Sequence, residues 1–272
     1  MACDVADVLQ SVLRSDGSPP FLKRRAITAL SHLDIPVALG SVSDLLFADE
    51  ASVAYSAFDS ADGLPSTNRI IISAAVAQLQ KLQDAYANKQ ALSHNQAALL
   101  GKVALILKLA YRADDLLGDE LHDVRKAVVF LAGANDRVVL ERVVSLFAEL
   151  SNDDDHELIV HLLSSNSARV RSLAALACSR CSPDMILRHK RVLIALLDDD
   201  SADVRNFALY ALRKGLGEKA GSYLSKPEYE VQKARVLEKY REQSNCSTEI
   251  HPGNPNSERS RPRQFGQGSG LF

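Results

Sequence analysis

Two short motifs contain the residue types that bind metals in proteins. His156 and Glu157 precede His161 in an apolar stretch, and at first sight the order resembles a helical zinc-protease motif. Two histidines share one helix face when they are four residues apart, whereas a spacing of five turns them about 140° from each other. The spacing therefore predicts no metal site at this position.

Cys178 and Cys181 form a single Cys-x-x-Cys pair. A structural zinc site needs about four ligands, and no second pair of this kind is present. A redox motif of this type belongs in a βαβ unit, while the surrounding sequence has helical spacing. We therefore expect both cysteines to be small buried core residues and the chain to hold no metal or cofactor.

Other common motifs of catalysis are absent from the sequence. Gly215 and Gly217 are followed neither by a third glycine nor by Lys-Ser or Lys-Thr, so no phosphate-binding loop is indicated. No Gly-x-Ser-x-Gly nucleophile elbow occurs. The acidic runs 153–155 and 198–200 lack the alternating ligands of a calcium loop, and we expect solvated turns there. These absences predict that the chain is not an enzyme and has no small-molecule substrate.

Basic residues are the remaining candidates for function. Residues 162–241 contain 15 Lys and Arg against 9 Asp and Glu, whereas residues 1–161 contain 14 against 22. Such a surface can steer a charged partner. Three interpretations stay open for residues 162–241: a solvated charged face, a site for an acidic protein partner, or a salt-sensitive nucleic-acid site.

The elements that must position these residues are helices. Apolar residues recur at helical spacing, strand signals are nearly absent, and Ser or Ser-Pro often stands where a helix would begin. Short connections between helices favour antiparallel neighbours. The predicted helices cover residues 3–14, 19–33, 36–47, 50–61, 66–87, 93–112, 121–133, 136–150, 154–164, 167–180, 183–197, 201–214 and 227–243.

A repeated pattern links these helices. Leu162-Leu163 precedes Val170 and Ala174, and the same pattern returns 34 residues later as Leu196-Leu197, Val204 and Ala208. One helix would end in the Leu pair, and the Val and Ala of the next would share one face. Such a hairpin buries its apolar face only by stacking on further hairpins. Related anchors stand at Leu22, Val53 and Val124, and the gap of 71 residues between the last two predicts a further degenerate unit near 70–110.

The segments 123–125 and 203–205, both Asp-Val-Arg, and 169–171, Arg-Val-Arg, resemble the HEAT-repeat family in its short HEAT-like form. The resemblance implies an all-α solenoid of about six antiparallel helix pairs, with first helices on the convex side and second helices on the concave side. In that family an Asp and an Arg of the second helix typically form a ladder between repeats. The ladder residues implied here are Asp123, Arg125, Arg171, Asp203 and Arg205.

Position in the repeat predicts which residues meet a partner. A non-catalytic scaffold would bind a protein segment in its concave groove, with an acidic segment as one candidate. Exposed positions beside the repeat signature are the candidates: Lys126, Ser172, Asn206, Tyr210, Arg213 and Lys214. The alternatives are nucleic-acid binding along residues 162–241, and a lyase subunit similar to the HEAT-like chromophore-attachment subunits of phycobiliproteins.

Composition bounds the setting in which the chain works. No run of 18 or more apolar residues occurs, so no membrane span is expected. Four cysteines in 272 residues are too few for a disulfide scaffold, which favours a cytoplasmic location, with the nucleus as the alternative. We expect residues 1–243 to form the solenoid and residues 244–272, rich in Ser, Pro, Gly and Asn, to be a disordered tail.

Overall fold

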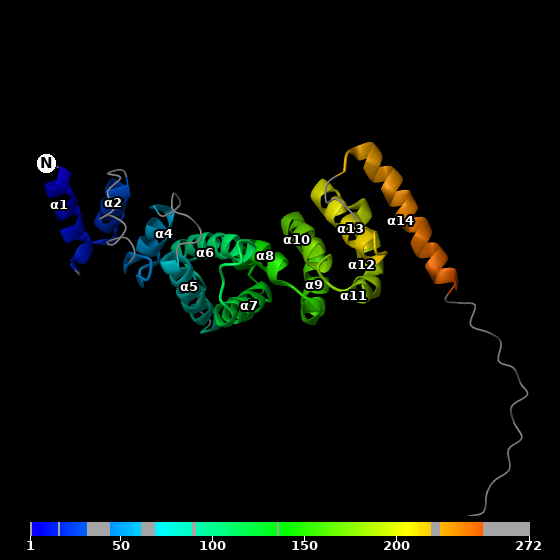
Figure 1. Ribbon diagram of the computed structural model, residues 1–272, viewed down its shortest axis with the longest axis horizontal. Coiled ribbons are helices and arrows are strands. Elements are labelled where there is room, and N and C mark those ends of the chain that lie inside the picture. Colours follow the sequence, from blue (N-terminus) through cyan, green and yellow to red (C-terminus); the bar gives the residue numbers. More distant parts are fainter. Residues whose placement is uncertain are drawn as a thin grey trace, which may run out of the picture.

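The computed structural model describes residues 2–15, 17–31, 44–60, 69–88, 91–134, 136–218 and 224–246. These residues form helices and loops, with no strand among them, which confirms the predicted all-α class (Figure 1). The elements are α1 (Ala2–Arg14), α2 (Pro20–Ser31), α4 (Ala51–Ser60), α5 (Arg69–Ala87), α6 (His94–Arg112), α7 (Gly118–Ala132), α8 (Arg137–Leu150), η2 (Asp153–Asp155), α9 (His156–Leu163), α10 (Ala168–Cys178), α11 (Pro183–Arg188), α12 (Lys190–Ala195), η3 (Leu196–Asp198), α13 (Ala202–Gly215) and α14 (Lys226–Cys246).

Most predicted helices appear within a few residues of their expected bounds. Ser93 caps α6 as predicted, because its hydroxyl accepts from the Gln96 amide while the Gln96 side chain accepts from the Ser93 amide. The predicted helix 183–197 is instead divided at His189, whose φ of −98° and ψ of 7° leave the helical region. The His189 ring stacks on His156 of α9, a tertiary contact that the local sequence does not reveal. The predicted helix 36–47 lies mostly outside the described residues.

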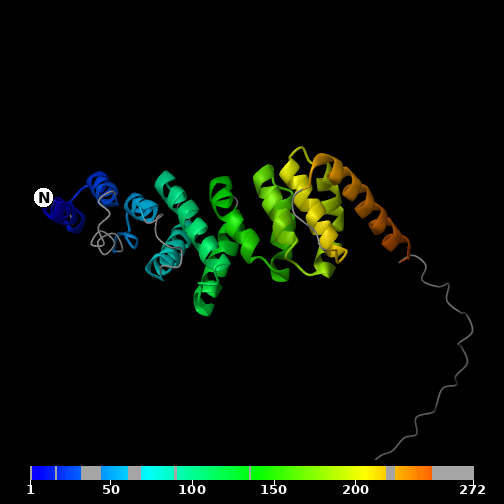
Figure 2. The same ribbon diagram turned by 45° about the horizontal axis from the view of Figure 1, so that its top comes forward.

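The helices form two parallel rows. The second helices of the repeats pack against one another in the order α2, α4, α6, α8, α10 and α13, while α5 with α7 and α9 with α12 form contacts in the first-helix row. In Figure 1 the second-helix row lies along the upper side, toward which both ends of the stack curve. Figure 2 shows the same succession from α1 to α14 along the long axis, as expected for a solenoid.

Repeat length varies along the stack. The second helices begin at residues 20, 51, 94, 137, 168 and 202, so successive repeats span 31, 43, 43, 31 and 34 residues. The pair of α5 and α6, which spans 69–112, is the degenerate unit predicted near 70–110. It lacks the signature but has the same hairpin architecture.

One predicted anchor belongs to the wrong row. Val124 lies in α7, a first helix, whereas the anchor of that repeat is Val139 in α8. Val139 follows the N-cap residue Asp136 by three positions, as Val170 follows Ser167 in α10. Both helices of a repeat have apolar residues at helical spacing, so the pattern of Leu pair and Val alone did not separate them.

The signature residues form the interior between the rows. Val170, Ala174, Val204 and Ala208 are fully buried, and α10 and α13 make the most extensive contact between any two helices of the described chain. Small side chains at these positions allow the two helix backbones to approach closely. The predicted role of the Val and Ala positions is therefore confirmed.

The last helix, α14, covers the carboxy-terminal end of the stack. The Tyr229 hydroxyl donates to the Leu197 carbonyl at 2.7 Å, the Tyr240 hydroxyl donates to the Leu212 carbonyl at 2.8 Å, and Val236 between them is buried. The helix extends to Cys246, three residues past its predicted end. The tail predicted after it lies, from residue 247 onward, outside the described residues. Within the described part, no helix combines the length and apolar character that crossing a membrane requires.

Candidate functional site

Two arginines of the predicted ladder, Arg125 and Arg171, tie neighbouring repeats together. Arg171 donates through Nε and Nη2 to both carboxylate oxygens of Asp199, at 2.8 and 3.0 Å, across the boundary between two repeats. Its Nη1 also donates to the Ser165 carbonyl in its own loop. Arg205, the residue 34 positions later, holds its own loop in the same way by donating to the carbonyls of Asp199 and Asp200.

The carboxylates that accept from Arg125 and Arg171 are not among the predicted ladder residues. Arg125 pairs with Asp155 at 2.7 Å and Arg171 pairs with Asp199, and both aspartates lie at the loops of the following repeat. Asp123, which the family pattern suggested, accepts a hydrogen bond from Gln80 of α5 instead. Asp203 lies at the exposed start of α13. The acidic runs 153–155 and 198–200 therefore supply the structural partners of the ladder arginines.

Two of the predicted partner-binding residues are misplaced. Lys126 is exposed, but it lies on α7 in the first-helix row. Ser172 is buried, and its hydroxyl donates to the Arg169 carbonyl one turn earlier in the same helix. The predictions that these two residues are exposed on a second helix are therefore wrong.

The four predicted residues of α13 do lie on a second helix. Asn206, Tyr210 and Arg213 are partly buried and Lys214 is exposed, with its ammonium group 6.0 Å from the centre of the Tyr210 ring. The Arg213 guanidinium pairs with Glu218 at 3.2 Å, so its charge is already partly satisfied. Their role in partner binding stays a prediction.

Charge is segregated between the two rows of helices. The second helices α2, α4, α6, α8, α10 and α13 contain 13 Lys and Arg against 4 Asp and Glu, a net charge of +9. The first helices α1, α5, α7, α9, α11 and α12, with η2 and η3, contain 8 against 12, a net charge of −4. The excess of positive charge therefore also follows the second-helix row, in addition to the linear segment 162–241.

Many cations of the segment 162–241 are engaged in internal ion pairs. Glu218 contacts Arg213, Arg235 and Lys239, and these contacts join α14 to the end of α13. Lys233 pairs with Asp198 in the same junction. These cations stabilise the end of the stack. In the centre of the second-helix row Lys102 likewise pairs with Asp59 and Arg171 with Asp199, so ion pairing alone does not separate the two regions, and a pocket distinguishes the centre.

A pocket of about 360 Å³ opens on this central part of the row. Four consecutive second helices line it, through Tyr55 of α4, Lys102 and Leu105 of α6, Arg142 of α8 and Arg169 of α10. We call the outer surface of α4, α6, α8 and α10 around this pocket the second-helix face. His94 and Glu141 complete its polar lining, and the three cations Lys102, Arg142 and Arg169 beside Leu105 suit the binding of a group that is anionic and partly apolar.

The second-helix face continues past the pocket along α6. Leu105 and Leu109 are 50% and 43% exposed, and they alternate with Lys102 and Arg112 at intervals of three and four residues. These four residues therefore form one stripe along α6, in which Leu105, Leu109 and Arg112 are exposed, while the Lys102 side chain is 10% exposed and pairs with Asp59. An apolar and cationic stripe of this kind can bind a segment that has both apolar and acidic side chains.

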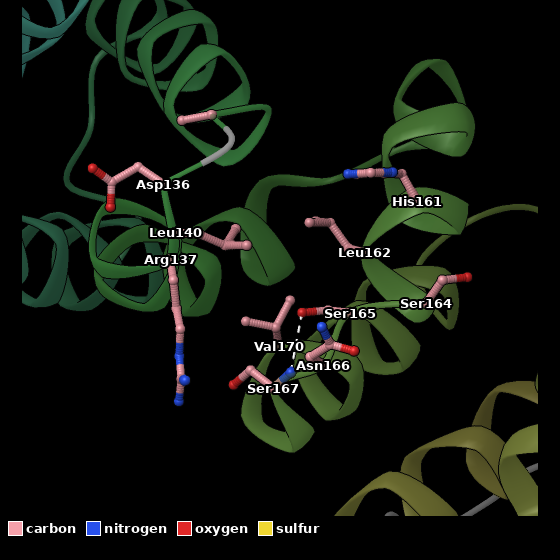
Figure 3. Close-up of a pocket in the computed structure, with 11 residues that line it drawn as sticks. Asp136, Arg137, Leu140, His161, Leu162, Ser164, Ser165, Asn166, Ser167 and Val170 are labelled. Carbon is pink, nitrogen blue, oxygen red and sulfur yellow. Dashed lines mark hydrogen bonds between the residues drawn. The ribbon is translucent and has the colours of Figure 1, made fainter.

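A second pocket, also of about 360 Å³, lies at the edge of the stack where the loops of two repeats meet (Figure 3). Leu140, Leu162 and Val170 lie at its centre, with Arg137 and His161 on either side. The Ser167 amide donates to the Ser165 hydroxyl at 3.2 Å, and Arg137 pairs with Glu141. Its polar groups largely hold the loops themselves, so it is a weaker candidate for partner binding.

The described residues contain no group of three or more His, Cys, Asp and Glu placed to bind a metal. Cys178 and Cys181 are buried free thiols, and the burial of both side chains was predicted. Burial raises the pKa of Cys178 to about 12, and burial with the nearby carboxylates of Asp153 and Asp155 raises that of Cys181 to about 11. Raised values disfavour the thiolate, the form that reacts and that binds metals.

We expect neither thiol to react in the folded protein. In a variant with Cys3 and Cys246 changed to Ser, iodoacetamide at mildly alkaline pH should label Cys178 and Cys181 only when denaturant is added, because the folded chain holds them as buried thiols. Mass spectrometry after timed exposure measures the labelled fraction. Rapid labelling of either cysteine without denaturant would contradict this assignment.

Comparisons with known proteins agree with the fold. No protein-family model matches the sequence, and no curated protein matches it. Two engineered proteins solved by the Northeast Structural Genomics Consortium are similar in structure, both at 18% sequence identity. The first has a TM-score of 0.55, and the match covers 87% of this chain and 68% of the engineered chain. The second has a TM-score of 0.52, and the match covers 79% of this chain and 97% of the engineered chain. An archaeal HEAT-like repeats protein from Thermococcus onnurineus matches at 14% identity and a TM-score of 0.43, over 92% and 91%. With its two rows of stacked antiparallel helix pairs, the chain is an all-α solenoid.

Proposed function

We propose that this chain is a non-catalytic scaffold that binds a protein segment on its second-helix face. The observation that carries the proposal is the segregation of charge, because one row of helices has a net charge of +9 while the other has −4. The second-helix face itself, formed by α4, α6, α8 and α10, contains 7 Lys and Arg against 3 Asp and Glu, a net charge of +4. A predominantly positive surface, hollowed by a pocket and lined by exposed leucines, is suited to an oppositely charged partner. The extended surface of a solenoid is a common place for such partners to bind.

A protein partner fits this face better than a nucleic acid does. Leu105 and Leu109 interrupt the cations of α6, and the carboxylates of Glu141 and Glu149 lie among the cations of α8. Phosphate binding favours unbroken lines of Lys and Arg, with aromatic residues for bases to stack on. Apolar side chains between cations favour a peptide that has apolar and acidic residues.

The test begins with the selection of random dodecapeptides on the intact chain. Selected peptides are then measured against a face variant, Leu105→Ser with Arg142→Gln, and a matched control, Leu117→Ser with Lys126→Gln, which removes one exposed leucine and one cation from the first-helix row. We expect the face variant to weaken binding about tenfold, the effect of losing about 1.4 kcal/mol at an interface. The control variant should bind as the unmodified chain does.

Three outcomes would contradict the proposal. The first is that no peptide is enriched, and the second is that selected peptides bind the face variant as well as the control. The third uses a short DNA duplex and a short single-stranded RNA as probes. If the chain binds either probe more tightly than the peptides, and the face variant loses that binding, the second-helix face is a nucleic-acid site.

A further inference from the structure

One carboxylate on the second-helix face is buried beneath three cations. Glu149 of α8, with a side chain only 3% exposed, contacts Arg112 and Lys108 of α6 and Arg180 at the end of α10. Its Oε1 accepts from Nε of Arg112 at 3.2 Å and lies 3.8 Å from Nζ of Lys108, which also donates to the Ser145 hydroxyl. We call these four charged residues the Glu149 cluster. It joins three consecutive repeats and has a net charge of +2.

The two arginines of the cluster face the solvent. The side chains of Arg112 and Arg180 are 57% and 36% exposed, in contrast to the buried carboxylate below them. A guanidinium has five N–H donors in a planar fork, and the contacts with Glu149 use Nε and Nη2 of Arg112 and Nη2 of Arg180. Both arginines can therefore donate to a second oxyanion from above while they hold Glu149 from below.

The Glu149 cluster has one carboxylate for three cations. Burial is the largest cause that lowers the pKa of Lys108; the charges of Arg112 and Arg180 also lower it, while Glu149 acts in the opposite direction. The three cations repel one another, with a single carboxylate between them. An added anion at the surface would relieve that repulsion.

The apolar neighbours of the cluster narrow the choice of anion. Leu109 lies in α6 between Lys108 and Arg112, and Leu105 lies one turn earlier, both exposed. A free phosphate or a nucleic-acid backbone would gain nothing from two exposed leucines. A peptide that has an acidic residue beside an apolar one can satisfy both kinds of neighbour.

A similar group around Glu218 does not offer the same combination. Glu218 also contacts three cations, Arg213, Arg235 and Lys239, but these belong to α13 and α14 and hold the last helix in place. The Glu149 cluster differs because it spans α6, α8 and α10 at the centre of the row and borders the leucine stripe.

We propose that the Glu149 cluster is the receptor for an aspartate or glutamate of the bound segment, whose neighbouring apolar side chain packs on Leu105 and Leu109. The inference rests on the proposed function, because it names the chemistry of the partner that occupies the second-helix face. Arg112 and Arg180 are the residues that contact the acid, and Glu149 orients both guanidinium groups.

The test is a double-mutant cycle on the peptides selected with the intact chain. Arg112→Gln and Arg180→Gln are made singly, so that Glu149 keeps two cations, and each acidic residue of a peptide is changed to its amide. We expect each arginine change to weaken binding about fivefold, the size of a partly exposed ion pair. When the acidic residue of the peptide that contacts the cluster is replaced by its amide, the same arginine changes should have little effect on affinity. This non-additivity shows that the arginine and the peptide acid interact directly.

Control variants separate recognition from folding. Arg112→Lys should lose part of the affinity, because an ammonium group cannot hold Glu149 and a second oxyanion with the fork of a guanidinium. Arg191→Gln on the exposed side of α12 should retain all of the affinity, while circular dichroism on heating measures whether each variant is folded. Glu149→Gln should bind the acidic peptide more tightly than the parent, because it removes the competing carboxylate and raises the cluster charge to +3. If that variant does not fold, the two arginine cycles still decide the question.

The outcomes distinguish this inference from the proposed function. Selected peptides that depend on Leu105 and Arg142 but are not enriched in acidic residues, or that show additive losses in the cycle, would overturn the inference while the second-helix face remained a binding surface. Peptides that ignore every variant of the second-helix face would overturn the proposed function itself.

Discussion

Replacing Asp199 by alanine should lower the free energy of unfolding by about 2–3 kcal/mol, the cost of removing one partner from a largely buried ion pair. Asp199 accepts two hydrogen bonds from Arg171 in the preceding repeat and one from the Ser201 amide at 2.9 Å. The Asp199 and Arg171 side chains are both mostly buried. The variant leaves the guanidinium and the amide without these partners at the junction of two repeats.

Urea unfolding of the variant and the parent measures this difference. Asp200→Ala is the matched control, because Asp200 is exposed and its contact with Arg205 uses the backbone carbonyl, which the substitution retains. We expect the control to change stability by less than about 0.5 kcal/mol, as is usual at exposed positions. Equal effects of the two substitutions would show that the ladder contributes nothing specific.

The same ion pair has a pH dependence of defined sign. The hydrogen bonds from Arg171 hold the pKa of Asp199 below its value in the unfolded chain. The ionised Asp199 therefore stabilises the folded state at pH values above about 3.9, the pKa of an aspartate in the unfolded chain. This stabilisation is lost as the pH falls through the lower pKa that Asp199 has in the folded protein. The stability difference between the parent and Asp199→Ala should therefore narrow in acid.

Replacing Gly215 by alanine should destabilise the protein by about 1–3 kcal/mol, the usual cost of overpacking a core. A Cβ at this position would lie 2.8 Å from Cγ2 of Ile186 in α11 and 2.8 Å from the hydroxyl oxygen of Tyr240 in α14. Neither atom can easily move, since Ile186 is buried and the Tyr240 hydroxyl is bonded to the Leu212 carbonyl. Glycine thus lets α13 approach the two helices that cover its end.

Gly101 in α6 provides the matched control for this substitution. Its added Cβ would meet Cδ of Arg142 at 3.0 Å, but Arg142 is an exposed, flexible side chain that can move aside. Gly101→Ala should therefore raise the free energy of unfolding by up to about 1 kcal/mol, which is the difference in helix propensity between alanine and glycine. Thermal unfolding of both variants is expected to show shifts of opposite sign, and shifts of the same sign would contradict the packing described at Gly215.

The stacked architecture could be predicted from sequence because it depends on local signals. Leucine pairs, serine caps and the Val and Ala spacing mark each hairpin by itself, and no contact between distant residues is needed to detect them. The row to which a helix belongs is harder to predict, as Val124 shows. An N-cap residue three positions before the anchor, as in Asp136 with Val139, is the signal that would have corrected the register.

The candidate binding surface could not be predicted in the same way. Lys108, Arg112, Glu149 and Arg180 come from three repeats of unequal length, so no constant offset brings them together in the sequence. Charges were counted over residues 1–161 and over residues 162–241. Each of these segments contains helices of both rows, so the counts do not show that the two rows differ in net charge. The signal that would have helped is Glu149 in the otherwise apolar end of α8, because a buried acid requires cationic neighbours.

Hydrogen–deuterium exchange of the intact chain, with and without a saturating selected peptide, tests the central claim most directly. If a segment binds the second-helix face, the peptide should slow exchange in α6, α8 and α10, with the largest change at the exposed end of α6 that contains Arg112. Exchange in the first helices α5, α7 and α9 should change much less. Protection confined to those first helices, or to the loop-edge pocket beside Arg137 and His161, would contradict the claim.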